Sequence, residues 1–250
     1  MRKIIFLLGL VVTFCTSCEF SENIYINEDG SGKMEFSFDA SALMEMGGDE
    51  MGEFGEEERM DSIMHFRDFL EEKKDSIATL SKQDQEELKA LEPFSLHMLM
   101  DPKTKEMNFE LFTDFKSVNE LQDMFAAMSK IQNLDSKNKE KDDNPLAKSL
   151  SGTNTDVVYS FENNVFTRTS TIVDKELHKQ SLDSMEEGTG MIFASSKLKL
   201  NYHFPRKIKS VSNDKVYFSE DKKSFVLELD FMEYIRNPES GNIEVVLEDE

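Results

Sequence analysis

The residue with the most defined chemistry in this chain is a cysteine near its start. Cys18 follows Thr16 and Ser17, which end a short apolar run that begins after the basic pair Arg2 and Lys3. A basic start, an apolar stretch and small residues before a cleavage position make up a bacterial secretory signal. A cysteine directly after that position is typical of a lipoprotein signal. The run is shorter than the roughly 20 residues of a membrane-spanning helix, which favours cleavage over a retained span.

We therefore expect a lipoprotein signal peptide at residues 1–17 and lipidation of Cys18, with palmitate among the acyl groups. Cys15 stands where such signals usually carry an aliphatic residue, so an ordinary secretory signal and a retained signal anchor stay open as alternatives. The chain has two cysteines. Loss of Cys15 and acylation of Cys18 would leave no thiol for a disulfide, a zinc ligand or a nucleophile.

The other side chains that could do chemistry form no recognisable motif. His65, His97, His178 and His203 fall in four separate segments without the short spacing of metal ligands. No serine lies in a Gly-x-Ser-x-Gly elbow, and no glycine-rich phosphate-binding loop occurs. We expect a protein that is not an enzyme, with no catalytic residue, metal or cofactor. The 50 acidic residues keep one alternative open, a carboxylate-dependent or metal-assisted hydrolase of the cell envelope.

Charge restricts the partners of the chain. Its formal charge is −21, and removal of Arg2 and Lys3 with the signal lowers the 29 basic residues to 27, against 50 acidic residues, which gives −23. Such a surface repels phosphate backbones and anionic lipid head groups. Nucleic acid is therefore not an expected partner. We expect the lipid on Cys18 to hold the chain on the membrane, and an envelope protein or envelope lipid to be its ligand.

Apolar residues that alternate on both sides of a turn predict a series of β-hairpins. Four segments have this pattern, and two more are expected to form single strands: 24–38, 96–111, 157–172 and 216–231, then 198–204 and 243–247. Helical spacing predicts helices at 60–70, 81–93, 117–131 and 174–188. The third of these begins with a capping box, in which Ser117 and Glu120 would bond free amides at the helix start.

Acidic residues stand where strands are expected to end and helices to begin. Asp39, Asp114, Asp174 and Asp230 each follow the last apolar residue of a predicted strand. We interpret this pattern as a repeated ββα unit. Because an amphipathic helix needs a sheet face to cover, the sequence predicts an α+β fold, with antiparallel sheets built from β-hairpins and helices packed on one face.

Composition divides the expected mature chain into three parts. An N-terminal α+β region spans residues 18–134 and includes an acidic, glycine-rich loop at 47–58. Residues 135–155 are rich in Asp, Lys, Asn and Ser and are expected to form a polar linker or loop. A strand-rich α+β region follows at 156–250.

The order of elements near the C-terminus resembles that of a known family. A strand from Leu198 leads to Phe204-Pro205 and Ile208, and a final strand follows Asn237-Pro238. Together with the lipoprotein signal and the first hairpin, this order resembles the LppM-type envelope lipoproteins. The resemblance covers the two ends of the mature chain, about half of its length. It implies an α+β lipoprotein domain at the cell envelope, with lipid or glycolipid binding as the suggested role.

We expect a lipid-anchored bacterial envelope lipoprotein that serves as a binding or structural module for a partner protein or an envelope lipid. Glu19, directly after the cysteine, is not the Asp that favours retention in the inner membrane. The outer membrane is therefore the expected location.

Overall fold

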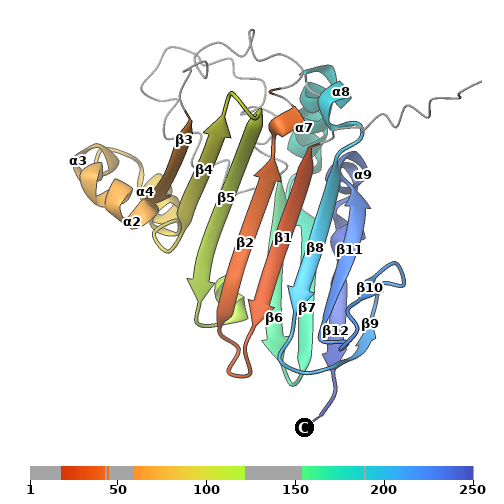
Figure 1. The fold of residues 1–250 in the computed structure, drawn as a ribbon. Helices are drawn as coiled ribbons and strands as arrows, with labels where there is room; N and C mark the ends of the chain where they lie inside the picture. Colours follow the sequence, from red (N-terminus) through yellow and green to blue (C-terminus); the bar gives the residue numbers. More distant parts are fainter. Residues whose placement is uncertain (1–17, 43, 45–58, 122–153, 189, 250) are drawn as a thin grey trace, which may run out of the picture.

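The structure is a computed structural model that describes residues 18–42, 44, 59–121, 154–188 and 190–249. Within these residues, twelve strands form two sheets (Figure 1). In the larger sheet the strands follow the order β10 (Tyr217–Phe218), β11 (Ser224–Asp230), β8 (Lys197–His203), β1 (Glu19–Ile26), β2 (Gly32–Asp39), β5 (Glu106–Phe115), β4 (Ser95–Asp101) and β3 (Met60–His65).

Strand β1 lies inside the larger sheet between β2 and β8, and its pairing with β8 is parallel, whereas the other neighbours pair antiparallel. The turn to β2 needs glycine at two positions. Gly30 has a φ of 78°, which favours a residue without a Cβ. A Cβ on Gly32 would lie 1.9 Å from the carbonyl oxygen of Tyr25. Local turn chemistry thus fixes one neighbour of β1, while the other comes from a distant part of the chain.

The smaller sheet has the order β6 (Thr155–Glu162), β7 (Val165–Ile172), β12 (Ile243–Leu247) and β9 (Ile208–Val211). It lies behind β1, β8 and β11 in Figure 1. Asn163 and Asn164 join β6 to β7 with φ values of 52° and 65°, as a two-residue hairpin turn requires. The ring of Phe166 on β7 lies 5.3 Å from that of Tyr202 on β8. The two sheets therefore pack face to face through aromatic side chains.

Phenylalanines fill the space beneath the start of β1. The ring of Phe20 stacks on Phe38 at 4.5 Å and on Phe231 at 4.1 Å, and Phe193 lies 5.8 Å away. All four side chains are at most 1% exposed. Burial of one such side chain stabilises a fold by about 1.5–3 kcal/mol. This cluster joins β1 and β2 to segments from the C-terminal part of the chain.

Short helices lie at the ends and edges of the sheets: α2 (Phe66–Glu72), α3 (Lys74–Ile77), α4 (Lys82–Lys89), η1 (Val118–Glu120), α7 (Lys175–Gly188), α8 (Gly190–Phe193), α9 (Phe231–Arg236) and η2 (Pro238–Gly241). Two of them begin at the predicted aspartates. Asp174 accepts hydrogen bonds from the amides of Glu176 and Leu177, and Asp230 accepts one from the amide of Glu233. Carboxylates at this position satisfy amides that have no partner within the helix.

The four predicted hairpins and the two predicted single strands are confirmed. The helix predicted from residue 60 begins instead at Phe66, because residues 60–65 form β3 and pair with β4. In that pairing Met64 packs against the core and Asp61 faces the other side of the sheet. Partner strands decide between helix and strand for a short apolar segment of this kind.

The capping box is present in part. Ser117 accepts a hydrogen bond from the amide of Asn119, and Glu120 accepts one from the amide of Lys116, around the single turn η1. The predicted helix beyond Leu121, the acidic loop at 47–58 and nearly all of the polar segment at 135–155 lie outside the described residues.

The chain has a mixed α and β fold that is mostly sheet, in two sheets with mainly antiparallel pairing. Strands from both sides of residues 135–155 share the larger sheet, since β8, β10 and β11 extend the sheet that β1 to β5 begin. No helix in the described part of the chain is both long enough and apolar enough to cross a membrane.

Candidate functional site

The predicted lipidation site lies at the very start of the sheet. Cys18 directly precedes β1, and its side chain is 1% exposed. Burial raises the pKa of the Cys18 thiol to about 11, and the negative charge of Asp39 adds to this effect. A thiol in this state is a poor nucleophile, because the thiolate is the reactive form. Lipidation of Cys18 stays a prediction, and it places the anchor next to the first residue of β1.

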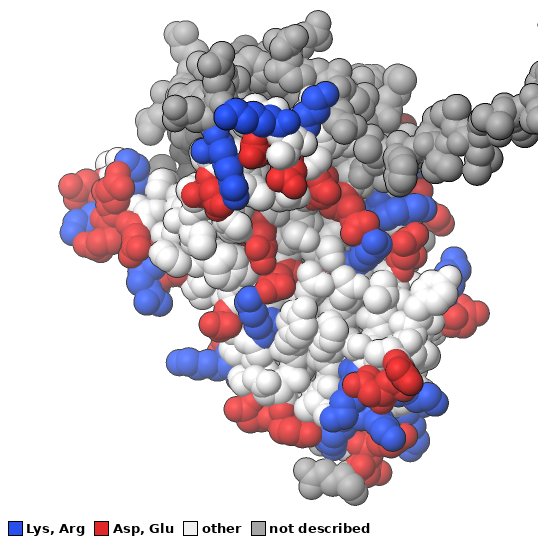
Figure 2. Space-filling view, viewed as in Figure 1, with Lys and Arg blue, Asp and Glu red and all other residues white. Residues whose placement is uncertain are grey.

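The larger sheet has one face that points away from the smaller sheet, which we call the outer face. Alternation along β1 places Phe20, Glu22 and Ile24 in the interior and Ser21, Asn23 and Tyr25 on the outer face. The parallel register sets Asn23 beside Asn201 and Tyr25 beside His203 on β8. Figure 2 looks onto this face, where uncharged side chains gather over the lower halves of β1, β8 and β11.

Side-chain amides form a fixed pair at the centre of this uncharged area. The amide nitrogen of Asn201 donates to the Ser21 hydroxyl at 2.8 Å and to the Asn23 side-chain oxygen at 2.8 Å. These bonds set the orientation of both amide groups. They leave the Asn23 nitrogen, a donor, and the Asn201 oxygen, an acceptor, without a hydrogen-bond partner among the described residues. One donor and one acceptor, carried by register partners on adjacent strands, are thus left available on the outer face.

Two aromatic rings stand beside the amide pair. The rings of Tyr25 and His203 stack at 4.4 Å with an angle of 12° between their planes. Burial lowers the pKa of His203 below its ordinary value, which favours the neutral imidazole. On β11 the neighbour of His203 is Ser224, whose side chain is small. Farther along the face, Tyr217 on β10 is 74% exposed. We call Asn23, Tyr25, Asn201, His203 and Tyr217 the platform.

Charged side chains surround the platform on the same face. Lys199 forms an ion pair with Glu19 at 2.6 Å, and Lys33 pairs with Glu35. These groups neutralise one another in pairs. The four charges of these two ion pairs therefore cancel beside the platform, although the whole chain has a formal charge of −21.

The outer face carries a second polar cluster near its other edge. His97 on β4 lies 2.9 Å from Asp61 on β3 and 3.6 Å from Glu110 on β5. The hydrogen bond that His97 donates to the Asp61 carboxylate raises the pKa of His97, and Glu110 adds to the effect. His65 forms a hydrogen bond with the hydroxyl of Ser95 at 2.8 Å. Among the described residues, no group of three or more potential ligands has the geometry of a metal site.

A hollow of about 400 Å³ lies beside the end of β11 and is lined mainly by polar residues. Asp214, Glu228, Asp230, Glu233 and Glu239 contribute carboxylates to its wall. Lys215 is the basic residue of this lining. Sequence spacing gave no indication of this hollow, because its residues come from β11, α9, η2 and the segment after β9.

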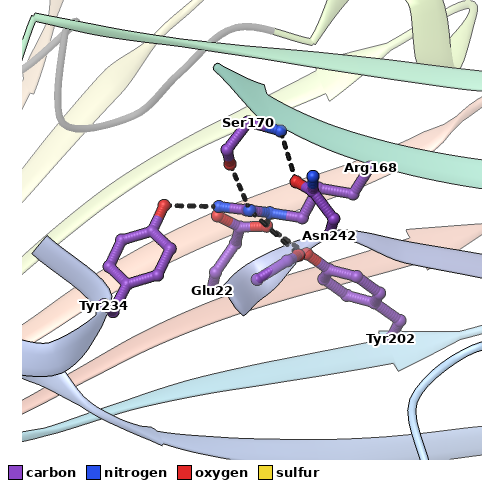
Figure 3. Close-up of polar contacts among 7 residues, drawn as sticks. Glu22, Arg168, Ser170, Tyr202, Tyr234 and Asn242 are labelled. Carbon is purple, nitrogen blue, oxygen red and sulfur yellow. Dashed lines mark hydrogen bonds and ion pairs between the residues drawn. The ribbon is translucent and has the colours of Figure 1, made fainter. Parts of the chain in front are cut away.

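A charged network lies between the two sheets (Figure 3). The guanidinium of Arg168 on β7 donates to the Glu22 carboxylate at 3.3 Å, to the Ser170 hydroxyl at 2.8 Å and to the Tyr234 hydroxyl at 2.9 Å. Tyr202 donates its hydroxyl proton to the same oxygen of Glu22. The side chains of Arg168 and Glu22 are 1% and 2% exposed. This network joins β1 and β8 of one sheet to β7 of the other.

Backbone and tyrosines complete the environment of Arg168. Its guanidinium also donates to the carbonyl oxygen of Gly241 at 3.2 Å. A Cβ on Gly241 would lie 2.9 Å from that guanidinium and 2.9 Å from the Tyr234 ring, so a larger residue would force these side chains to shift. Burial raises the pKa of Tyr202, and the charge of Glu22 raises it further, which keeps the hydroxyl protonated as a donor. We conclude that the network is structural, since its members satisfy one another away from solvent.

Comparison with known proteins gives no relative: no family model, no curated protein and no solved structure matches this chain.

The structure brings together residues that sequence spacing could not connect. Asn23 and Asn201 lie 178 positions apart, and only the parallel pairing of β1 with β8 joins them. Of the four histidines, His97 and His203 reach partners on the outer face, whereas His178 is buried. The sequence did contain one indication of these residues, the alternation of polar residues along 19–25 and 197–203. Such alternation marks the exposed face of a strand, but it does not identify the neighbouring strand in the sheet.

Proposed function

We propose that this chain is a lipid-anchored binding module of the bacterial envelope, held by Cys18, and that the platform on its outer face is the ligand-binding surface. The observation that carries this proposal is the amide pair. Both amide groups lie on the outer face and are oriented by bonds to their neighbours, and these bonds leave the Asn23 nitrogen and the Asn201 oxygen with unused hydrogen-bonding capacity. Groups positioned in this way bind a ligand with little loss of conformational entropy.

The proposed anchor and location rest on the sequence. The basic start, apolar run and Cys18 support lipidation, and Glu19 supports the outer membrane. We further propose that the chain belongs to the LppM-type lipoproteins. We also propose that its strands and helices follow a repeated ββα arrangement, with the helices over one sheet face. The order of strand, Phe204-Pro205, Ile208 and final strand supports the first. The helices that begin at Asp174 and Asp230 directly after strands support the second.

Metabolic labelling with palmitate tests the anchor. The wild-type chain is expected to take up label and to remain in the membrane fraction, whereas Cys18→Ser is expected to lose both properties. Cys15→Ser serves as the matched control and is expected to keep them. Label that persists in Cys18→Ser would refute the anchor.

Cross-linking in the native membrane tests the platform. A photoreactive amino acid at Tyr217, which is 74% exposed, is expected to capture an envelope component, with proteins and lipids both identified by mass spectrometry. The same group at Val158, 56% exposed on the smaller sheet, is the control position. Equal capture at both positions would contradict a binding surface at the platform.

The acidic hollow favours a second candidate function, a carboxylate-dependent hydrolase. Several carboxylates meet there, as general acid and base chemistry requires. If this candidate is correct, envelope fragments released by the wild-type chain should not be released by Glu233→Gln. Equal release by both proteins would exclude a catalytic role for that carboxylate.

A further inference from the structure

The open groups of the platform define what kind of molecule could bind there. The Asn23 nitrogen donates and the Asn201 oxygen accepts, and both come from adjacent strands, which lie about 4.8 Å apart. A fully apolar ligand would cover these groups without bonding them, and a buried unpaired polar group costs about 1–3 kcal/mol. The ligand must therefore carry donors and acceptors close together.

The rings of the platform require apolar surface in the same ligand. Tyr25 and His203 stand next to the amide pair, and Tyr217 lies two strands away from Asn201 through Val226. Tyr25 is 40% exposed and Tyr217 is 74% exposed, so both rings have surface available to a ligand. Aromatic side chains provide large contact area with little loss of rotamer freedom.

Charge excludes many ligands that would satisfy these two conditions. Lys33 and Lys199, which flank the platform, are already paired with Glu35 and Glu19, so neither of these two ammonium groups is free to bind an anion. The formal charge of −21 repels phosphates and acidic polymers at a distance. An uncharged ligand with adjacent hydroxyl groups and apolar ring faces meets all three conditions.

We propose that the platform binds an uncharged oligosaccharide, with sugar hydroxyl groups bonded to Asn23 and Asn201 and the C–H face of a sugar ring packed on an aromatic side chain. This inference rests on the proposed function and names its ligand class. A pyranose hydroxyl can accept from the Asn23 nitrogen while its neighbour donates to the Asn201 oxygen. The platform spans β1, β8, β11 and β10, so it extends over several sugar units.

Calorimetric titration of the full chain tests the inference. The protein is held in a detergent without a sugar head group, and the probes are chitohexaose and maltohexaose, with an alginate hexamer as the charged comparison. At least one uncharged hexamer is expected to bind, with at least tenfold higher affinity than the alginate hexamer. Failure of both uncharged hexamers to bind at millimolar concentration would overturn the inference.

Substitutions locate the binding. Asn23→Asp keeps the acceptor for Asn201 and replaces the outward donor by an acceptor, and it is expected to weaken binding at least tenfold. Asn108→Asp adds the same charge elsewhere on the outer face and is expected to leave binding unchanged. Tyr25→Ala is expected to weaken binding at least tenfold, whereas Ile63→Ala on β3 is the apolar control. Circular dichroism checks that each variant is folded. Unchanged affinity in both Asn23→Asp and Tyr25→Ala would overturn the inference.

The outcomes separate this inference from the function on which it rests. If cross-linking at Tyr217 captures an envelope protein, or a second copy of this chain, and no hexamer binds, the platform is a binding surface and the oligosaccharide inference is wrong. If a hexamer binds and Cys18→Ser retains palmitate, the oligosaccharide inference stands and the proposed anchor is wrong.

Discussion

Arg168 and Glu22 show how one charged pair can determine the packing of two sheets. Each is almost fully buried, and together they connect β7 to β1 across the interface. An ion pair removed from water depends on both of its members, because a single charge left in the interior costs far more than the pair contributes. The same pair therefore favours one alignment of the sheets over others that would separate the charges.

Loss of one member of this pair is expected to be severe. Glu22→Gln keeps the shape of the side chain but leaves the Arg168 guanidinium without a counter-charge, so we expect a loss of about 3–5 kcal/mol in the free energy of unfolding, measured in urea. Replacing both residues by leucine is expected to recover part of that loss. Arg59→Ala removes an exposed ion pair with Asp61 and is the control with little expected effect. A similar small change in Glu22→Gln would show that the buried pair contributes little.

The pKa values of two histidines on the outer face are shifted in opposite directions. The carboxylates of Asp61 and Glu110 raise the pKa of His97, while burial lowers the pKa of His203. In an NMR titration, His97 is expected to lose its proton at a higher pH than His203. Asp61→Asn should lower the pKa of His97 and leave that of His203 unchanged. Coincident titration of the two rings would contradict the described contacts.

The sign of each effect on stability follows from linkage. The stability that His97 contributes is present below its unfolded pKa, ordinarily 6.5, and is lost as the pH rises through its higher folded value. His203 contributes stability above its unfolded pKa, and this is lost as the pH falls through its lower folded value.

At the scale of elements, the β6–β7 turn depends on backbone conformation more than on contacts. Asn163 and Asn164 both have positive φ, a region that residues other than Gly, Asn and Asp rarely adopt. Asn163→Ala is expected to reduce the free energy of unfolding by about 1 kcal/mol. Asn163→Gly keeps the turn accessible and is the matched control, expected to leave stability near the wild-type value. Thermal unfolding followed by circular dichroism measures both. Equal losses would point to side-chain contacts instead.

The hairpins could be predicted from sequence because their signals are local. Alternation along residues 24–38 and the glycines of the intervening turn act within a few positions of one another. The same reasoning failed at β3, where Met60, Ile63 and Met64 fit a helical spacing as well as a strand, and pairing with β4 decided the outcome. The platform depends on β1 meeting β8, a contact between segments with no local signal in common. For this reason four of its five residues were predicted to lie on strands, with Asn23 directly before one, but they were not predicted to meet.

At the scale of the whole molecule, the shared sheet predicts a single unfolding transition. The N-terminal strand β1 has its neighbours on both sides of the polar segment at 135–155. We expect the Cys18 thiol, in a Cys15→Ser chain that is not lipidated, to react with a thiol reagent only as the whole fold is lost in urea. The midpoint of that reaction should match the midpoint seen by circular dichroism. Reaction at a clearly lower urea concentration would show that the start of β1 opens independently.

The parallel pairing of β1 with β8 also has a consequence for the proposed export of the chain. In a chain exported from its N-terminus, β1 would emerge long before the strand that lies beside it, 178 positions later. Closing so long a loop is slow and must wait for most of the chain. During that interval Cys18 would lack Ser196, whose side chain interacts with its thiol in the complete fold, where Cys18 is 1% exposed. If Cys18 is lipidated as we propose, the modifying enzyme would therefore have to act on an open chain, before completion of the sheet buries the thiol.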